Sequence, residues 1–178
     1  MTSSVIATSA SGRPVPLTHS ALDSHHVESQ LGRPLRGSWT VARRCHLGFP
    51  MVIENHPLLD DGTPFPTLYW LTCPILLKRV SRLEAGGEMA RLNGRLDTDA
   101  SLRTRLEGSI QRLISRRDAL AVLESQMAPP GGGPDKVKCL HAHVAQELAD
   151  APNPVGGWAL SQTGWPDCIA GCVQDPAP

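Results

Sequence analysis

The sequence carries no excess of charge and no long apolar run. Its 178 residues include 17 lysines and arginines against 17 aspartates and glutamates, which gives a formal net charge of zero. Because nucleic-acid-binding proteins usually show a clustered excess of basic residues, we expect no nucleic-acid partner. No apolar stretch approaches the ~18 residues of a membrane-spanning helix, so we also expect no membrane association.

The start of the sequence lacks the features of a secretory signal. No basic stretch is followed there by a long apolar segment, and we therefore expect a cytoplasmic protein. In that reducing compartment the five cysteines are expected to be free thiols or metal ligands rather than a disulfide framework.

Proline and glycine, 16 of each, divide the chain into three parts. Residues 1–36 are rich in Ser, Thr, His and Pro and show no apolar period, which predicts a mobile N-terminal tail with room for a short helix over residues 21–31. Residues 37–160 are predicted to form a single α+β domain. Residues 161–178 are predicted to be an irregular C-terminal tail.

The middle part contains three β-rich segments and then several helical ones. Residues 39–44 and 50–55 are separated by a loop with Gly48, as in a hairpin, and the apolar run 65–73 predicts a third strand. In chain order these segments form a small antiparallel sheet of three strands. Helices that begin near residues 74, 88, 99, 136 and 154 are expected to pack against it.

Two cysteines fall at the ends of predicted strands. Cys45 follows the first strand and Cys73 ends the third. In an antiparallel sheet in chain order these two strands run in the same direction, so both thiols lie at one rim, roughly 10 Å apart. Cys73 also precedes a helix, whose N-terminal amides and dipole stabilise a thiolate.

The helix predicted over residues 136–149 adds two further candidate ligands. If Cys139 and His143 are both helical, they are four residues apart and share one face, which suits chelation. By the same helical spacing, His141 lies on the opposite face, which carries the apolar residues of this helix. We therefore expect His141 to be a hydrogen-bonded core histidine or, if it binds the metal, a supporting or substitute ligand.

These positions predict a metal centre at the sheet rim made of Cys45, Cys73, Cys139 and His143. Such a soft, four-ligand set favours zinc, with an iron–sulfur cluster as the second choice. The thiols are dispersed, however, whereas structural zinc sites usually show two close pairs. The close pair Cys168-x-x-x-Cys172 offers a replacement for one or two of the ligands.

Two other functions fit the same residues. Cys73 or Cys139 is a candidate nucleophile of a hydrolase or transferase, with a histidine as base and Asp135 as acid. Alternatively, the cysteines are ordinary core residues of a non-enzymatic adaptor that binds an unknown protein partner.

The sequence also resembles a known family in five blocks, at residues 44–50, 64–74 (PFPTLYWLTCP), 82–84, 137–145 (VKCLHAHVA) and 153–156. Together they are similar to the bacterial family called domain of unknown function 501. The resemblance implies a bacterial cytoplasmic protein. Genes of this family often lie beside those for a septum-formation initiator and an exopolyphosphatase, which implies a context in cell division or polyphosphate metabolism. The family supplies no catalytic residues that transfer to this chain.

Overall fold

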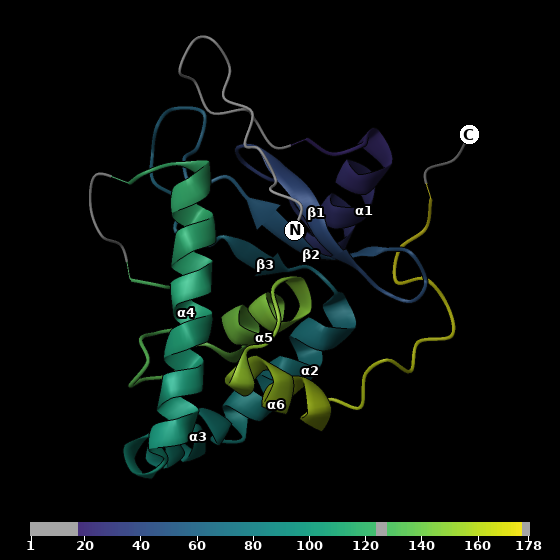
Figure 1. Cartoon of the computed structure of the whole chain (residues 1–178). Helices are drawn as coiled ribbons and strands as arrows, with labels where there is room; N and C mark the ends of the chain where they lie inside the picture. The colour runs from purple at the N-terminus through teal and green to yellow at the C-terminus, as the bar shows by residue number, and fades with distance from the viewer. Residues whose placement is uncertain (1–17, 124–127, 176–178) are drawn as a thin grey trace, which may run out of the picture.

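The computed structural model describes residues 18–123 and 128–175 of the chain (Figure 1). In chain order its elements are α1 (Ala21–Leu31), β1 (Trp39–Arg44), β2 (Pro50–Asn55), β3 (Tyr69–Leu71), α2 (Pro74–Ala85), α3 (Glu88–Thr98), α4 (Ala100–Leu120), α5 (Leu140–Ala149) and α6 (Pro154–Gln162). Helices pack around a small sheet, so the predicted α+β class is confirmed.

The three strands form an antiparallel sheet in the predicted order β1-β2-β3. In the central strand, Ile53 pairs with Val41 of β1 and with Trp70 of β3. The third strand is shorter than the predicted residues 65–73. Pro64 and Pro66 cannot donate backbone hydrogen bonds to a ladder, and β3 begins only at Tyr69.

Both faces of the sheet are covered, which explains why β2 is buried along its whole length. On one face, Val27 of α1 packs with Trp39 and Ile53. On the other face, Val52 belongs to a larger core built with the remaining helices. A strand buried on both sides needs a continuous rather than an alternating apolar run.

The N-terminal segment contains the short helix expected over residues 21–31, and this helix is attached to the sheet. Residues 21–31 form α1, whose Asp23 pairs with Arg44 of β1 at 2.8 Å. The Nε2 atom of Gln30 donates to the carbonyl oxygen of Pro50 at 2.9 Å. Helix α1 has one fully buried apolar side chain, Val27, with Leu31 packed beside it, and its other contacts are mostly polar, so it shows no apolar period in the sequence. Residues 1–17 of the predicted tail lie outside the described residues.

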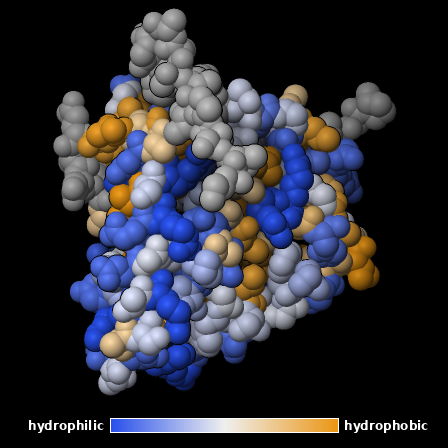
Figure 2. Space-filling model, in the orientation of Figure 1, coloured by the Kyte–Doolittle hydropathy of each residue, from blue (hydrophilic) through white to orange (hydrophobic). Residues whose placement is uncertain are grey.

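Helix α4 lies along one side of the molecule (Figure 1). Its Arg116 donates two hydrogen bonds to the buried carboxylate of Glu54 on β2, at 2.7 and 2.8 Å. Hydrophilic residues cover much of α4 on the face shown in Figure 2. None of the helices within residues 18–123 and 128–175 is long and apolar enough to cross a bilayer.

The C-terminal strap, residues 163–175, has no helix or strand, and it is attached to the domain at several points. Asp167 pairs with Arg79 of α2 at 2.7 Å. The carbonyl oxygen of Cys168 accepts a hydrogen bond from Nε2 of His46 at 2.8 Å. Figure 1 shows the strap in yellow, running from α6 past the β1–β2 turn. It therefore joins the helical side of the molecule to the sheet rim.

Candidate metal centre

The end of α2 meets the beginning of α5. Glu84 lies in the last turn of α2, Cys139 is the N-terminal capping residue of α5, and His141 is in the first turn of that helix. The Oε1 atom of Glu84 accepts a hydrogen bond from the amide of Leu140 at 2.7 Å. The carboxylate thus satisfies an amide at a helix N-terminus that has no partner within the helix, and this fixes its position.

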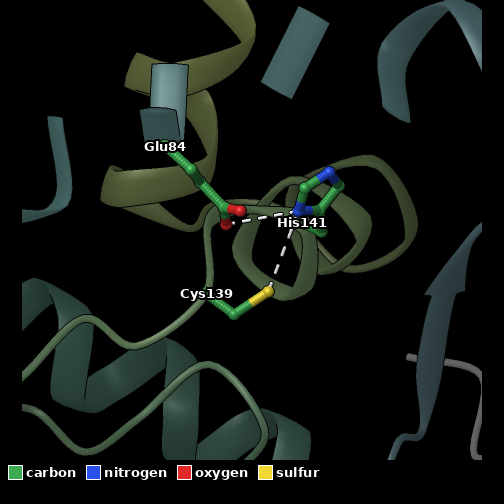
Figure 3. A group of neighbouring side chains, drawn as sticks. All are labelled: Glu84, Cys139 and His141. Atoms are coloured by element: carbon green, nitrogen blue, oxygen red, sulfur yellow. Dashed lines mark hydrogen bonds and ion pairs between the residues drawn. The ribbon is translucent and has the colours of Figure 1, made fainter. Parts of the chain in front are cut away.

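Three different ligand types converge at this junction (Figure 3). The Nδ1 atom of His141 lies 3.2 Å from Oε1 of Glu84 and 3.9 Å from Sγ of Cys139. All three ligand atoms lie within 4.8 Å of one another. The side chains of His141 and Glu84 are each 22% exposed, so the group is accessible to solvent.

The second ring nitrogen of His141 is held by the backbone of α2. Nε2 lies 3.1 Å from the carbonyl oxygen of Leu77 and 3.2 Å from Oγ of Ser81. Because a carbonyl oxygen only accepts, Nε2 carries a hydrogen. Nδ1 is therefore the nitrogen that gains or loses a proton, and when the ring is neutral the lone pair of Nδ1 faces the thiol and the carboxylate. Metal-binding histidines show this arrangement, with the distal N–H donated to a carbonyl or carboxylate.

The electrostatics of the junction favour a positive charge on or beside the ring. The contact with Cys139, the carbonyl of Leu77 and the charge of Glu84 together raise the pKa of His141 to about 9, against the opposing effect of burial. A proton on Nδ1 supplies this positive charge, and a metal cation bound between the three side chains would supply it as well.

The observed start of α5 corrects the predicted faces of Cys139 and His143. The helix begins at Leu140 rather than at residue 136, and Cys139 has extended backbone angles, with φ −154° and ψ 117°. Asn93 holds the preceding segment extended by bonding both the amide and the carbonyl of Val137. Helical spacing therefore does not apply to Cys139, whose neighbour is His141.

His143 is a buried core histidine. Its Nε2 lies 3.0 Å from the carbonyl oxygen of Gly131, and its Nδ1 accepts from the side-chain amide of Asn153 at 3.1 Å. The same amide donates to Gln146 at 2.8 Å. Burial lowers the pKa of His143 to about 4, which keeps the ring neutral. The structure thus places His141, rather than His143, beside Cys139.

Cys45 and Cys73 lie elsewhere, at the predicted sheet rim. Cys73 caps the N-terminal end of α2, whereas Glu84 is in its last turn. At 1.5 Å per residue the helix separates these positions by roughly 16 Å, more than any coordination sphere spans. The structure therefore does not gather Cys45, Cys73, Cys139 and His143 around one point.

Sequence reasoning missed Glu84. Among the described residues, Glu84 joins Cys139 and His141 in a group of three ligand atoms that lie within 4.8 Å of one another. Glu84 lies in the block at residues 82–84 that carried the family resemblance, two residues before the glycine pair that ends α2. The block at residues 82–84 was therefore a signal in the sequence that could have pointed to Glu84. Because this block is far from Cys139 along the chain, the sequence did not reveal that the two residues lie close together.

The comparisons with known proteins agree with this reading of the blocks. A family model described as "Protein of unknown function (DUF501)" matches residues 41–161, more than half of the chain. No curated protein and no solved structure matches the sequence significantly.

Proposed function

We propose that this chain, which belongs to the DUF501 family, binds a zinc ion through Glu84, Cys139 and His141. The observation that carries the proposal is the convergence of a carboxylate, a thiol and an imidazole nitrogen on one point. The bond from Nε2 of His141 to Leu77 supports it, because it turns the ligating lone pair towards the other two groups.

The ligand types favour zinc among the metals. Sulfur, nitrogen and oxygen ligands together suit this borderline-soft ion, whereas magnesium and calcium prefer oxygen alone. An iron–sulfur cluster needs several thiolates, and this junction has one. Three protein ligands leave the fourth position of a tetrahedral ion for water or a substrate, which is the arrangement of catalytic rather than structural zinc sites.

The geometry favours metal binding over a thiol nucleophile. In a cysteine–histidine–acid triad, one ring nitrogen faces the nucleophile and the other faces the acid. Here Cys139 and Glu84 both face Nδ1 of His141, and Nε2 is bonded to a backbone carbonyl. Glu84 therefore lies on the Nδ1 side of the ring together with Cys139, as a second metal ligand would, and not at Nε2, where the acid of a triad would lie.

Elemental analysis and zinc titration test the proposal. The full chain is purified without a nickel column, and zinc affinity is measured by competition with a chromophoric chelator. We expect Cys139→Ser, His141→Gln and Glu84→Gln each to weaken the binding of one zinc equivalent by at least about tenfold. Glu107→Gln on the exposed face of α4 is the matched control and should bind as the wild type does.

Other outcomes would replace the proposal. Unchanged zinc binding in all three variants would contradict it. An absence of zinc, together with much faster alkylation of Cys139 than of the other thiols, would favour the nucleophile. An absence of zinc with uniformly slow alkylation would favour the adaptor, in which the cysteines serve only for packing.

A further inference from the structure

We propose that a groove between α2 and the end of α6 binds a small dianion, a molecule with two carboxylate groups or one phosphate group. The groove has a volume of about 370 Å³, which is in the range of small-molecule sites. Its lining residues come from α2, from the end of α6 and from the C-terminal strap: Arg79, Arg82, Leu83, Gln162, Thr163 and Asp167. The proposal goes beyond zinc binding at the α2–α5 junction and does not depend on it.

The groove lies on the side of α2 that faces away from the junction. Ser81 and Glu84 of α2 contact His141 at the junction. With roughly 3.6 residues per turn, Arg79 and Arg82 point to the opposite side of the same helix. Figure 1 shows α6 beside α2, with the strap leaving from the end of α6. An anion in the groove is therefore separated from the metal ligands by the width of α2.

The guanidinium of Arg79 is fixed from two sides. Its Nη1 atom donates to the carbonyl oxygen of Thr163, the C-terminal capping residue of α6, at 3.0 Å. Its Nη2 atom donates to Oδ2 of Asp167 at 2.7 Å. The first bond satisfies a carbonyl at a helix end and sets the orientation of the side chain. The second bond shows that the guanidinium, in this orientation, already binds a carboxylate.

Arg82 supplies a second positive charge to the groove. It is exposed, and within residues 18–123 and 128–175 its side chain has no hydrogen bond or ion pair. Positions three apart on a helix are neighbours, so Arg79 and Arg82 can bond the same small molecule. The lining contains one carboxylate, that of Asp167, against these two guanidinium groups. The groove therefore has an excess of positive charge, which attracts an anion.

Asp167 acts as an internal competitor for that anion. Its side chain is 55% exposed, and it belongs to the strap rather than to a helix or strand. The bond to Arg79 lowers the pKa of Asp167, so the carboxylate is ionised at neutral pH. Exposed ion pairs of this kind are weak in water, and an anion that bonds both arginines can replace the carboxylate. A dianion matches the two positive charges that remain when Asp167 leaves.

Nuclear magnetic resonance of the isotope-labelled full chain tests the site. Inorganic phosphate and succinate are titrated separately at constant ionic strength and at a slightly alkaline pH, at which phosphate is mainly a dianion. A chelator is present, so no metal contributes. We expect saturable shifts of the amides near Arg82 and Thr163, and binding of acetate, a monoanion, that is at least about fivefold weaker. The probe that binds more tightly distinguishes a phosphate from a dicarboxylate ligand.

Three variants separate the roles of the lining residues. Arg82→Gln should weaken binding at least about fivefold, because one of the two positive charges is lost. Asp167→Asn should strengthen binding about two- to fivefold, because the competing charge is removed. Arg105→Gln, on the exposed face of α4, is the matched control and should bind as the wild type does. All three positions are exposed, so the variants are expected to fold, and circular dichroism verifies this.

Proteolysis of the strap gives a second measurement. The bound dianion should speed cleavage of the strap in the wild type but not in Arg82→Gln, and saturable binding without faster cleavage would overturn the displacement of Asp167. Shifts that do not saturate and are equal in the wild type, Arg82→Gln and Arg105→Gln would overturn the site itself. Arg82→Gln leaves all three proposed zinc ligands intact, so zinc affinity measured on the same variant distinguishes this failure from failure of the zinc proposal.

Discussion

Asn93 of α3 holds both backbone groups of Val137. Its Oδ1 accepts from the amide of Val137 at 2.7 Å, and its Nδ2 donates to the carbonyl at 3.1 Å. One side chain thus replaces the strand partner that the segment before α5 lacks. This contact decides where α5 begins, and so which residues surround Cys139.

Removal of that contact should affect both stability and the junction site. In Asn93→Ala the two backbone groups of Val137, a buried residue, lose their partner, and we expect the free energy of unfolding to fall by about 2 kcal/mol. Zinc binding should weaken as well, because Cys139 is no longer held at the helix start. Chemical denaturation and zinc competition measure the two effects. Gln111→Ala, on the exposed face of α4, should change neither.

Substitutions of the two histidines of α5 should affect different properties, zinc affinity in one case and stability in the other. His141→Gln removes a metal ligand that is only partly buried, so zinc affinity should fall while stability changes little. His143→Gln disturbs a buried hydrogen-bond network, so stability should fall by about 1–3 kcal/mol while the folded protein still binds zinc. The opposite pattern would restore the ligand set predicted from helical spacing.

The buried ring of His143 also predicts a pH dependence of stability. Its pKa of about 4 in the folded state lies below the ordinary value of 6.5. Between these two values the unfolded chain binds more protons, so this stabilising contribution is complete above pH 6.5 and is lost as the pH falls towards 4. The slope approaches about 1.4 kcal/mol per pH unit, and the total is roughly 3 kcal/mol.

Denaturant unfolding from pH 7.5 to 4, with a chelator present, measures this dependence. The chelator removes any contribution from metal release. His143→Gln should have a smaller slope than the wild type between pH 6.5 and 4, whereas His25→Gln, in which an exposed contact to the strap is removed, should keep the wild-type slope. Equal slopes in the wild type and His143→Gln would show that the ring titrates normally.

The sequence predicted the sheet and most helices because local signals and burial agreed there. Proline at the start of α2 and the glycine pair at its end marked that helix, and the apolar run of β2 marked a strand covered on both sides. The short helix expected over residues 21–31 is present as α1, but its attachment to the sheet was not predicted, since it depends on tertiary contacts of Asp23 and Gln30.

The candidate site was predictable only in part. Cys139 and His141 lie next to one another in the sequence, and their residue types indicated metal chemistry. The block at residues 82–84 pointed to Glu84 as a residue of interest, but its contact with Leu140 and His141 was not predictable, because that contact depends on how α2 and α5 pack. The face of Cys139 was misjudged because a tertiary contact from Asn93 delays the helix, and no helical periodicity reveals such a contact.

Gly171 offers a further test of how the strap is seated. In Gly171→Ala the new methyl group would meet two ring atoms of Phe49 at 2.7 Å, so either the ring or the strap must shift. We expect the free energy of unfolding to fall by about 1 kcal/mol and proteolysis of the strap to become faster, with no change in zinc binding at the α2–α5 junction. Gly108→Ala is the matched control. Nothing lies within 4 Å of its Cβ position in α4, so the helix should gain about 0.5–1 kcal/mol and the rate of strap proteolysis should stay as in the wild type. Unchanged stability together with unchanged proteolysis in Gly171→Ala would show that the strap does not depend on close packing against Phe49.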